Sequence, residues 1–257
     1  MHPKSSKCCY TGFFITQNGD IGLNTAKLRI GLVLFPGLTQ LDLTGPAEVL
    51  GRIPGVDLHL LWKDLNPVAS DRGLRLLPTT TFADCPSLDV ICVPGGPGQL
   101  NLMDDDTVLD FLRRVAPSCR LVTSVCTGSL VLAAAGLLRG YRATCHWTCI
   151  DQLSLFGALP VSERVVHDRN RLTGAGVTSG IDFALTLVAD LLGEDVAKEI
   201  QLKLEYDPQP PYNAGSPKNA PSTIVSSVRN ELAEFLTTRR AAAVKAAKRL
   251  EASASDS

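Results

Sequence analysis

Cys126 stands at the centre of the segment with the clearest chemical character in this sequence. It follows the run Leu-Val-Thr-Ser-Val at 121–125 and precedes Thr127 and a run of small residues that ends at Gly136. A strand that enters a cysteine directly and is followed at once by a helix is the pattern of a nucleophile elbow. We therefore expect Cys126 to be a nucleophile whose thiol pKa is lowered by the helix N-terminus. The competing interpretation is a buried, inert cysteine.

Two glycines, Gly95 and Gly96, follow the apolar run that ends at Val93. Without side chains they let a substrate approach the backbone, so that the N–H groups of Gly96 and Thr127 would form an oxyanion-type donor pair. The Thr127 hydroxyl is also placed to hold a water or to steer a substrate. A Gly-Gly turn by itself is usually only a turn, but ligands of open α/β sheets bind at the carboxyl ends of parallel strands, where Gly96 and Cys126 are both expected.

Asp42 and His146 are the candidates for a proton-transfer partner of the thiol. Asp42 follows the first expected strand and its loop, at the same sheet edge, where a neighbouring negative group would raise its pKa into a usable range. Its other interpretation, which does not exclude the first, is a helix N-cap. Histidine is the most common base for a thiol. His146 has a second interpretation as a buried pocket wall, tied to a carboxylate such as Asp182.

Short apolar runs alternate with helical patterns from residue 28 onward. This alternation predicts βαβ units and an α/β fold with a mostly parallel sheet covered by helices on both faces. Segments 74–81, 161–166 and 171–173 predict short antiparallel additions to it. The predicted strands are 28–35, 56–62, 88–93 and 120–125. One predicted helix begins at Asp42, and three more span 104–115, 127–135 and 181–192.

Composition divides the chain into a central domain and two terminal segments. Residues 1–27 lack a helical or strand period and are predicted to be a flexible extension, whereas 28–222 form the α/β domain. Residues 223–257 are predicted to contain one long helix, frayed at its end, that packs on the domain or on a second copy. Its apolar stripe consists of Val225, Val228, Leu232 and Phe235.

Charge and cysteine content narrow the function classes. The chain has 25 Lys and Arg against 26 Asp and Glu, which disfavours nucleic-acid binding. No apolar run is long enough for a membrane span or a signal peptide, so we expect a cytoplasmic protein whose eight cysteines are thiols. No Cys-x-x-Cys pair is present, and the acidic run 104–106 suits a helix start, so we expect no metal and no organic cofactor.

Several motifs resemble the ThiJ/PfpI superfamily, whose members are related to class I glutamine amidotransferases. The resemblance covers about residues 28–250 and implies a flavodoxin-like three-layer sandwich and a homodimer. The motifs are Leu34-Phe-Pro36, Gln40-Leu-Asp-Leu-Thr-Gly-Pro46, Trp62-Lys-Asp64, Pro78-Thr-Thr-Thr-Phe82, Asp89-Val-Ile-Cys-Val-Pro-Gly-Gly96, Thr123-Ser-Val-Cys-Thr-Gly-Ser-Leu-Val-Leu132, Gly180-Ile-Asp-Phe-Ala-Leu-Thr186 and Gln201-Leu-Lys-Leu-Glu-Tyr206.

Within the superfamily, Thr127 after the nucleophile, where hydrolytic members have histidine, resembles the isonitrile hydratases. This resemblance implies a hydro-lyase, of the cyclohexyl-isocyanide hydratase type, that converts an isonitrile into an N-substituted formamide. It assigns catalytic roles to Cys126, Asp42 and Thr127, and leaves Gly95, Gly96 and His146 as the groups around the substrate.

Two other functions stay open. A glyoxalase- or stress-type enzyme, or a thiol redox sensor, would keep Cys126 and change the substrate. The sensing part of an AraC-type regulator has a similar Ala-Thr-x-His-Trp segment, here at 143–147. Only about 50 residues follow Tyr206, too few for the paired helix-turn-helix units of such regulators, and the net charge is −1.

Overall fold

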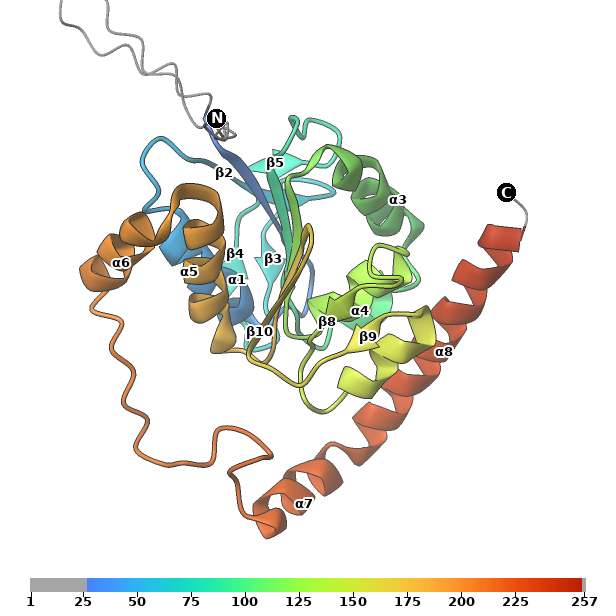
Figure 1. Ribbon diagram of the computed structural model, residues 1–257. Helices are drawn as coiled ribbons and strands as arrows, with labels where there is room; N and C mark the ends of the chain where they lie inside the picture. The colour runs from blue at the N-terminus through green and yellow to red at the C-terminus, as the bar shows by residue number, and fades with distance from the viewer. Residues whose placement is uncertain (1–26, 256–257) are drawn as a thin grey trace, which may run out of the picture.

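A seven-stranded sheet in the order β10-β11-β7-β6-β1-β2-β5 forms the centre of the fold (Figure 1). The structure, a computed structural model, describes residues 27–255, so the extension predicted for 1–27 lies, apart from Lys27, outside the described residues. The strands are β1 (Arg29–Val33), β2 (Asp57–Trp62), β5 (Thr80–Thr81), β6 (Val90–Val93), β7 (Leu121–Val125), β10 (Val165–Asp168) and β11 (Arg171–Gly174).

All neighbouring strands of this sheet are parallel except β10 and β11. Every residue of β6, β7 and β11 is buried, which explains why β6 is an apolar run without alternation and why the Thr and Ser residues of β7 are enclosed as well. The predicted mostly parallel α/β sheet is confirmed.

The expected antiparallel additions are confirmed in part. β10, which begins inside the predicted segment 161–166, pairs antiparallel with β11 from the predicted segment 171–173. β11 runs parallel to its other neighbour β7, however, and β5 from the predicted segment 74–81 runs parallel to β2, so the expected direction is wrong for β5. The segment before β5 does form an antiparallel pair, β3 (Val68–Ala69) with β4 (Arg75–Leu76), but outside the main sheet. These strands have two residues each, so side-chain alternation is too short to indicate direction.

Helices cover both faces of the sheet (Figure 1). On one face α1 and α6 lie against α5, and on the other α4 contacts α3 and α8. The expected helices are confirmed, whereas α6 was not predicted. The helices of this part are α1 (Gln40–Leu50), α2 (Gln99–Leu102), α3 (Asp106–Val115), η1 (Ala116–Ser118), α4 (Gly128–Ala134), η2 (Ile150–Phe156), α5 (Ser179–Leu192) and α6 (Glu194–Lys203), and a small sheet joins β8 (Arg142–Ala143) to β9 (Leu159–Pro160).

The C-terminal segment forms two helices instead of the single helix expected. α7 (Ser222–Glu231) ends at Leu232, and α8 (Ala233–Ser255) then runs along the domain beside η2 and α4 (Figure 1). Small side chains on one face of α8, at Ala243 and Ala246, are buried against the domain, whereas α7 has no buried residue. α8 therefore belongs to the packed fold, and the apolar positions of α7 stay only partly covered.

Gly128, the first residue of α4, marks the closest approach between α4 and the end of β6. A Cβ atom at this position would lie 2.0 Å from the Val93 carbonyl oxygen and 2.7 Å from that of Pro94. We expect Gly128→Ala to lower the free energy of unfolding by about 3 kcal/mol, because neither backbone carbonyl can move freely. Urea denaturation measures this, with Gly215→Ala, where the added Cβ meets nothing within 4 Å, as the control. Equal urea midpoints for Gly128→Ala and Gly215→Ala would contradict the close approach of α4 to the end of β6.

Candidate active site

Cys126 occupies the tight turn between β7 and α4, as the nucleophile-elbow pattern predicts. Its φ of 57° lies in the left-handed region that residues other than glycine seldom adopt. The Cys126 N–H donates to the Gly174 carbonyl oxygen over 3.0 Å, which ties the turn to the end of β11. A non-glycine residue held in this conformation is a frequent mark of functional positions.

The turn lies where ligands usually bind in a sheet of this kind. β1 and β6 are neighbours in the sheet, and the chain continues from β1 to β2 on one side and from β6 to β7 on the other. Such a switch point opens a crevice at the carboxyl ends of the strands. Cys126 follows β7, Gly95 follows β6, and Asp42 lies on the helix that follows β1, so the topology brings the three to one edge.

Asp42 lies in the first turn of α1 and is fully buried, with 0% of its surface exposed. Its Oδ2 accepts the Gly95 N–H over 3.0 Å, and its carboxyl contacts the Cys126 thiol. Its Oδ1 has no hydrogen-bond partner among the described residues. The N-cap interpretation is wrong because Thr39 occupies that position, which leaves Asp42 directed inward. The sequence therefore correctly places Asp42 beside the thiol.

Burial raises the pKa of Asp42 to about 7, far above the ordinary aspartate value of about 3.9. The contacts with the Cys126 thiol and the Gly95 N–H oppose this rise, and the negative charge of Asp71 adds to it. Near neutral pH the Asp42 carboxyl is consequently poised to take up and release a proton.

The pKa of the Cys126 thiol is raised well above its ordinary value, contrary to the expectation of a lowered pKa. Burial of the sulfur is the largest cause, followed by the negative charge of Asp42, while the Thr127 N–H acts in the opposite direction. α4 has only seven residues, so its N-terminus cannot outweigh a neighbouring carboxylate. At neutral pH the proton of this pair rests on sulfur, with Asp42 ready to accept it.

The glycine turn after β6 holds the site together through its backbone. Gly95 donates to Asp42, and the Gly96 N–H donates to Thr127 Oγ1 over 2.9 Å. The expectation that the Gly96 N–H faces a substrate is therefore wrong for this state, because the Thr127 side chain occupies it. The N–H of Thr127 does face the sulfur, as expected. A Cβ atom on Gly95 would lie 2.5 Å from the Thr127 nitrogen, so this approach requires glycine.

His146 is oriented by Thr148 and not by a carboxylate. Its Nδ1 lies 2.7 Å from Thr148 Oγ1, whereas the expected partner Asp182 binds Arg164 and accepts a hydrogen bond from Tyr206. The predicted link between His146 and Asp182 is wrong. Burial, followed by the positive charge of Arg239, lowers the pKa of His146 to about 4. His146 is thus a neutral ring near pH 7.

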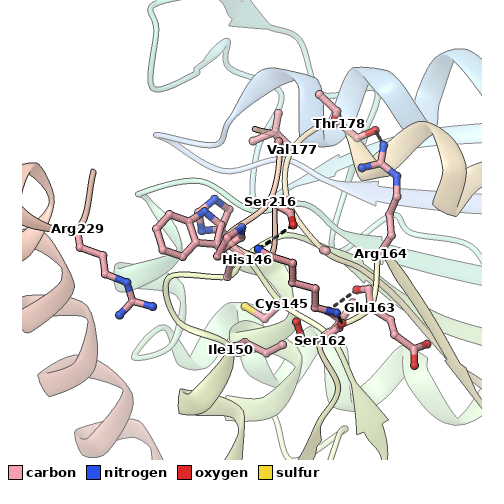
Figure 2. A pocket seen from close by; sticks show the side chains of 17 residues that line it. Cys145, His146, Ile150, Ser162, Glu163, Arg164, Val177, Thr178, Ser216 and Arg229 are labelled. Atoms are coloured by element: carbon pink, nitrogen blue, oxygen red, sulfur yellow. Dashed lines mark hydrogen bonds between the residues drawn. The ribbon is translucent and has the colours of Figure 1, made fainter. Parts of the chain in front are cut away.

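A cavity of about 630 Å³ reaches Ala175, the residue after the Gly174 whose carbonyl oxygen binds the Cys126 N–H, and its walls come from four segments (Figure 2). Cys126 has 5% of its surface exposed and is not among the lining residues, whereas Cys145 is one of them. The two cysteines lie close enough for a charge on Cys126 to raise the pKa of Cys145. The Arg229 guanidinium lies 5.2 Å from the Trp147 ring. The walls comprise 144–147 with Ile150, 162–164, 175–178, and 215–218 with Arg229.

Arg239 is a residue near the site that sequence reasoning missed. It comes from α8, is 6% exposed, and its Nη1 lies 3.3 Å from Thr148 Oγ1. Its charge acts on His146 and on the buried Cys145 and Cys149. The residues around Arg239 do not indicate that it lies near the site, since the local sequence of α8 is that of an ordinary surface helix.

Within residues 27–255 no group of three or more His, Cys, Asp or Glu side chains is arranged to hold a metal ion. The described helices also include none with the length and hydropathy of a membrane span.

The sequence and the fold both match known proteins. A profile of the DJ-1/PfpI family matches residues 28–190. The isonitrile hydratase of Pseudomonas putida is 57% identical over 223 residues, which cover 87% of this chain and 98% of that protein. A crystal structure of a ThiJ/PfpI family protein from Pseudomonas syringae superposes with a TM-score of 0.83 at 45% identity, covering 87% of this chain and 96% of the other.

A transcriptional regulator also matches, over a smaller share of its length. The HTH-type regulator GbdR of Pseudomonas aeruginosa is 32% identical over 192 residues, which cover 72% of this chain but only 52% of the regulator.

Proposed function

This chain belongs to the DJ-1/PfpI family, and from that premise we propose that it is an isonitrile hydratase, a hydro-lyase that converts isonitriles into N-substituted formamides. The observation that carries the proposal is the buried Cys126–Asp42 pair, in which a protonated thiol contacts a carboxyl whose pKa is about 7. The 57% identity to the Pseudomonas putida enzyme narrows the substrate class.

The first step needs the two groups of this pair. An isonitrile is converted at its terminal carbon, which must gain both a nucleophile and a proton. As the Cys126 sulfur forms a bond to this carbon, Asp42 takes the thiol proton and delivers it to the same carbon. The product is a covalent thioimidate that contains all atoms of the thiol and the isonitrile. The free Oδ1 of Asp42 is the oxygen available to carry the proton.

The second step releases the formamide. Water adds to the thioimidate carbon while Asp42 takes one of its protons, and the nitrogen gains a proton. The carbon–sulfur bond then breaks, the thiol regains its proton, and the N-substituted formamide leaves. The Thr127 hydroxyl positions the water, and the Thr127 N–H stabilises negative charge at the sulfur. Gly95 and Gly96 hold Asp42 and Thr127 in these orientations through their N–H groups.

The adjoining cavity suits the substituent on the isonitrile nitrogen. Trp147, Ile150 and Val177 give it apolar wall area, and the neutral His146 ring adds no charge there. We assign these residues to substrate binding and none of them to proton transfer.

Incubating the purified protein with cyclohexyl isocyanide tests the function. We expect N-cyclohexylformamide to form, and chromatography measures it. In a parallel incubation with methylglyoxal we expect little lactate. Turnover of methylglyoxal without formamide formation would instead support the glyoxalase alternative.

Replacing Thr127 by valine removes the hydroxyl and keeps the shape of the side chain. We expect kcat/KM for the isonitrile to fall about 10- to 100-fold, because the Gly96 N–H loses its acceptor at 2.9 Å and the water loses a partner. Steady-state kinetics measure this, with Thr237→Val on the exposed side of α8 as the matched control. Unchanged kinetics in Thr127→Val would remove Thr127 from the mechanism.

We also propose a cytoplasmic homodimer in which 223–257 adjoins the 28–222 domain. The partly covered apolar positions of α7 support a second copy as partner, and the six described free cysteines suit a reducing compartment. Light scattering coupled to size-exclusion chromatography tests the dimer. A monomeric mass at micromolar concentration would contradict it.

A further inference from the structure

Cys145 and Cys149 lie side by side in the loop that carries His146. Their sulfur atoms are 3.6 Å apart, and both side chains are buried, at 1% and 0% exposure. The Cys149 N–H donates to the His146 carbonyl oxygen over 3.0 Å, so a closed turn brings the two cysteines together. We propose that Cys145 and Cys149 form a reversible disulfide by reducing a hydroperoxide that enters the adjoining cavity.

The geometry permits this bond with a small movement. A disulfide has an S–S distance of about 2.05 Å, so the sulfurs must approach by roughly 1.5 Å. Cys145 lines the cavity of about 630 Å³, and its sulfur is visible at the cavity wall in Figure 2. The cavity therefore brings a small oxidant to the Cys145 side of the pair, and it leaves the loop room to shift so that the oxidant can reach Cys149, which is 0% exposed and does not line the cavity.

The surroundings of the pair activate one of its two thiols. The hydrogen bond from Cys145 lowers the pKa of Cys149, and the charge of Arg239 adds to this effect. The Arg239 Nε is buried and has no hydrogen-bond partner among the described residues, so it can stabilise a thiolate. Burial raises the pKa of Cys145, which keeps its proton. Cys149 is thus the attacking sulfur and Cys145 the resolving one.

The oxidation balances with the hydroperoxide as the sole oxidant. The Cys149 thiolate attacks one peroxide oxygen, the O–O bond breaks, and hydroxide or alkoxide leaves, which gives a sulfenic acid on Cys149. Cys145 then attacks that sulfur, and its proton leaves with the sulfenic hydroxyl as water. Two electrons pass from the thiol pair to the peroxide, and an external thiol reverses the oxidation.

The other described cysteines are poorer candidates. Burial raises the pKa of Cys92 and of Cys119 to about 12, and the pKa of Cys126 is also raised. This site is therefore distinct from the Cys126 nucleophile. Because the pair flanks His146, we expect oxidation to alter the wall of the substrate cavity and to raise KM more than it lowers kcat.

Peptide mapping of a Cys126→Ser variant tests the proposal independently of hydratase activity. The variant is exposed to a slight excess of hydrogen peroxide, alkylated with iodoacetamide and digested with trypsin. The tryptic peptide 143–164 contains Cys145, Cys149 and no other cysteine. We expect it to escape alkylation and to be two hydrogens lighter, and to become doubly alkylated after dithiothreitol. The proposal would be overturned if peptide 143–164 were doubly alkylated under conditions that oxidise other cysteines. Irreversible sulfinic acid at Cys145 or Cys149 would also overturn it.

Three variants in the Cys126→Ser background complete the test. Cys149→Ser should leave Cys145 alkylated at the same peroxide dose, and Arg239→Gln should slow disulfide formation at least about fivefold. The control Cys85→Ser should form the disulfide at the unchanged rate. Circular dichroism confirms the fold of each variant. Unchanged oxidation of Cys145 in Cys149→Ser would contradict the assigned roles.

Discussion

Replacing Cys126 by alanine should reduce isonitrile turnover by a factor on the order of 10⁴ or more, because no covalent thioimidate can form without the sulfur. The side chain is small and lies in a turn set by the backbone, so the fold should persist. Formamide release by the purified variant, compared with the unsubstituted protein, measures the effect.

The control for this prediction is Cys85→Ala, which removes a half-buried thiol that the mechanism does not use. It should turn over isonitrile at the original rate. Intact-mass spectrometry during turnover adds a direct readout, since a substrate adduct should appear in the unsubstituted protein and be absent from Cys126→Ala. Full activity in Cys126→Ala would end the proposal that this cysteine is the nucleophile.

Asp42→Asn should lower kcat/KM by a factor on the order of 10³, because the amide cannot carry the proton between the thiol and the isonitrile carbon. In the unsubstituted protein kcat/KM should rise with pH through an apparent pKa near 7, because Asp42 must be ionised to accept the thiol proton. The variant should lack this rise. A pH–rate profile of both proteins measures the difference, and an unchanged profile in Asp42→Asn would assign the pKa to another group.

The same substitution should stabilise the fold at high pH. Because the pKa of Asp42 is about 7 when folded and about 3.9 when unfolded, the folded chain binds the proton more tightly. The free energy of unfolding therefore falls as pH rises from about 4 to about 7, by up to roughly 4 kcal/mol, and stays lowered above that range. Asparagine does not ionise, so the Asp42→Asn variant does not lose stability in this way as pH rises.

Urea denaturation at pH 8 and at pH 4 separates this effect from a general change in packing. Asp42→Asn should gain stability over the unsubstituted protein at pH 8 and lose most of that gain at pH 4. Asp64→Asn, at an exposed carboxyl, is the matched control and should show neither change. A loss of stability in Asp42→Asn at pH 8 would show that the buried carboxylate is not costly to the fold.

The strands and helices around the site could be predicted because their patterns are local. β7 is rich in β-branched residues and ends at Val125, directly before Cys126, and α4 begins where small residues begin. The direction of β5 could not be predicted, since it depends on which strand the chain meets after a loop. α6 was missed because Glu194–Lys203 follows α5 after the single residue Gly193.

The members of the site could be predicted better than their contacts. Parallel strands bring Asp42, Gly95 and Cys126 to one edge wherever the sheet is wound this way, so their proximity follows from chain order. The acceptor of the Gly96 N–H depends on how the glycine turn after β6 packs against the turn at Cys126 and Thr127. The local sequence of either turn does not determine this packing. The thiol pKa was predicted in the wrong direction because burial of the sulfur beside Asp42 is a property of the assembled fold.

The position of Arg239 on α8 has a consequence for how the protein matures on the ribosome. During synthesis Cys126 and Asp42 leave the exit tunnel well before Arg239, and an N-terminal domain generally folds before the segments that follow it. The sheet and the thiol–carboxyl pair can therefore form first, while the charge that acts on Cys149 and His146 arrives only when α8 docks. A nascent chain stalled before residue 239 would carry the Cys126–Asp42 pair without the Arg239 charge that acts on Cys149 and His146.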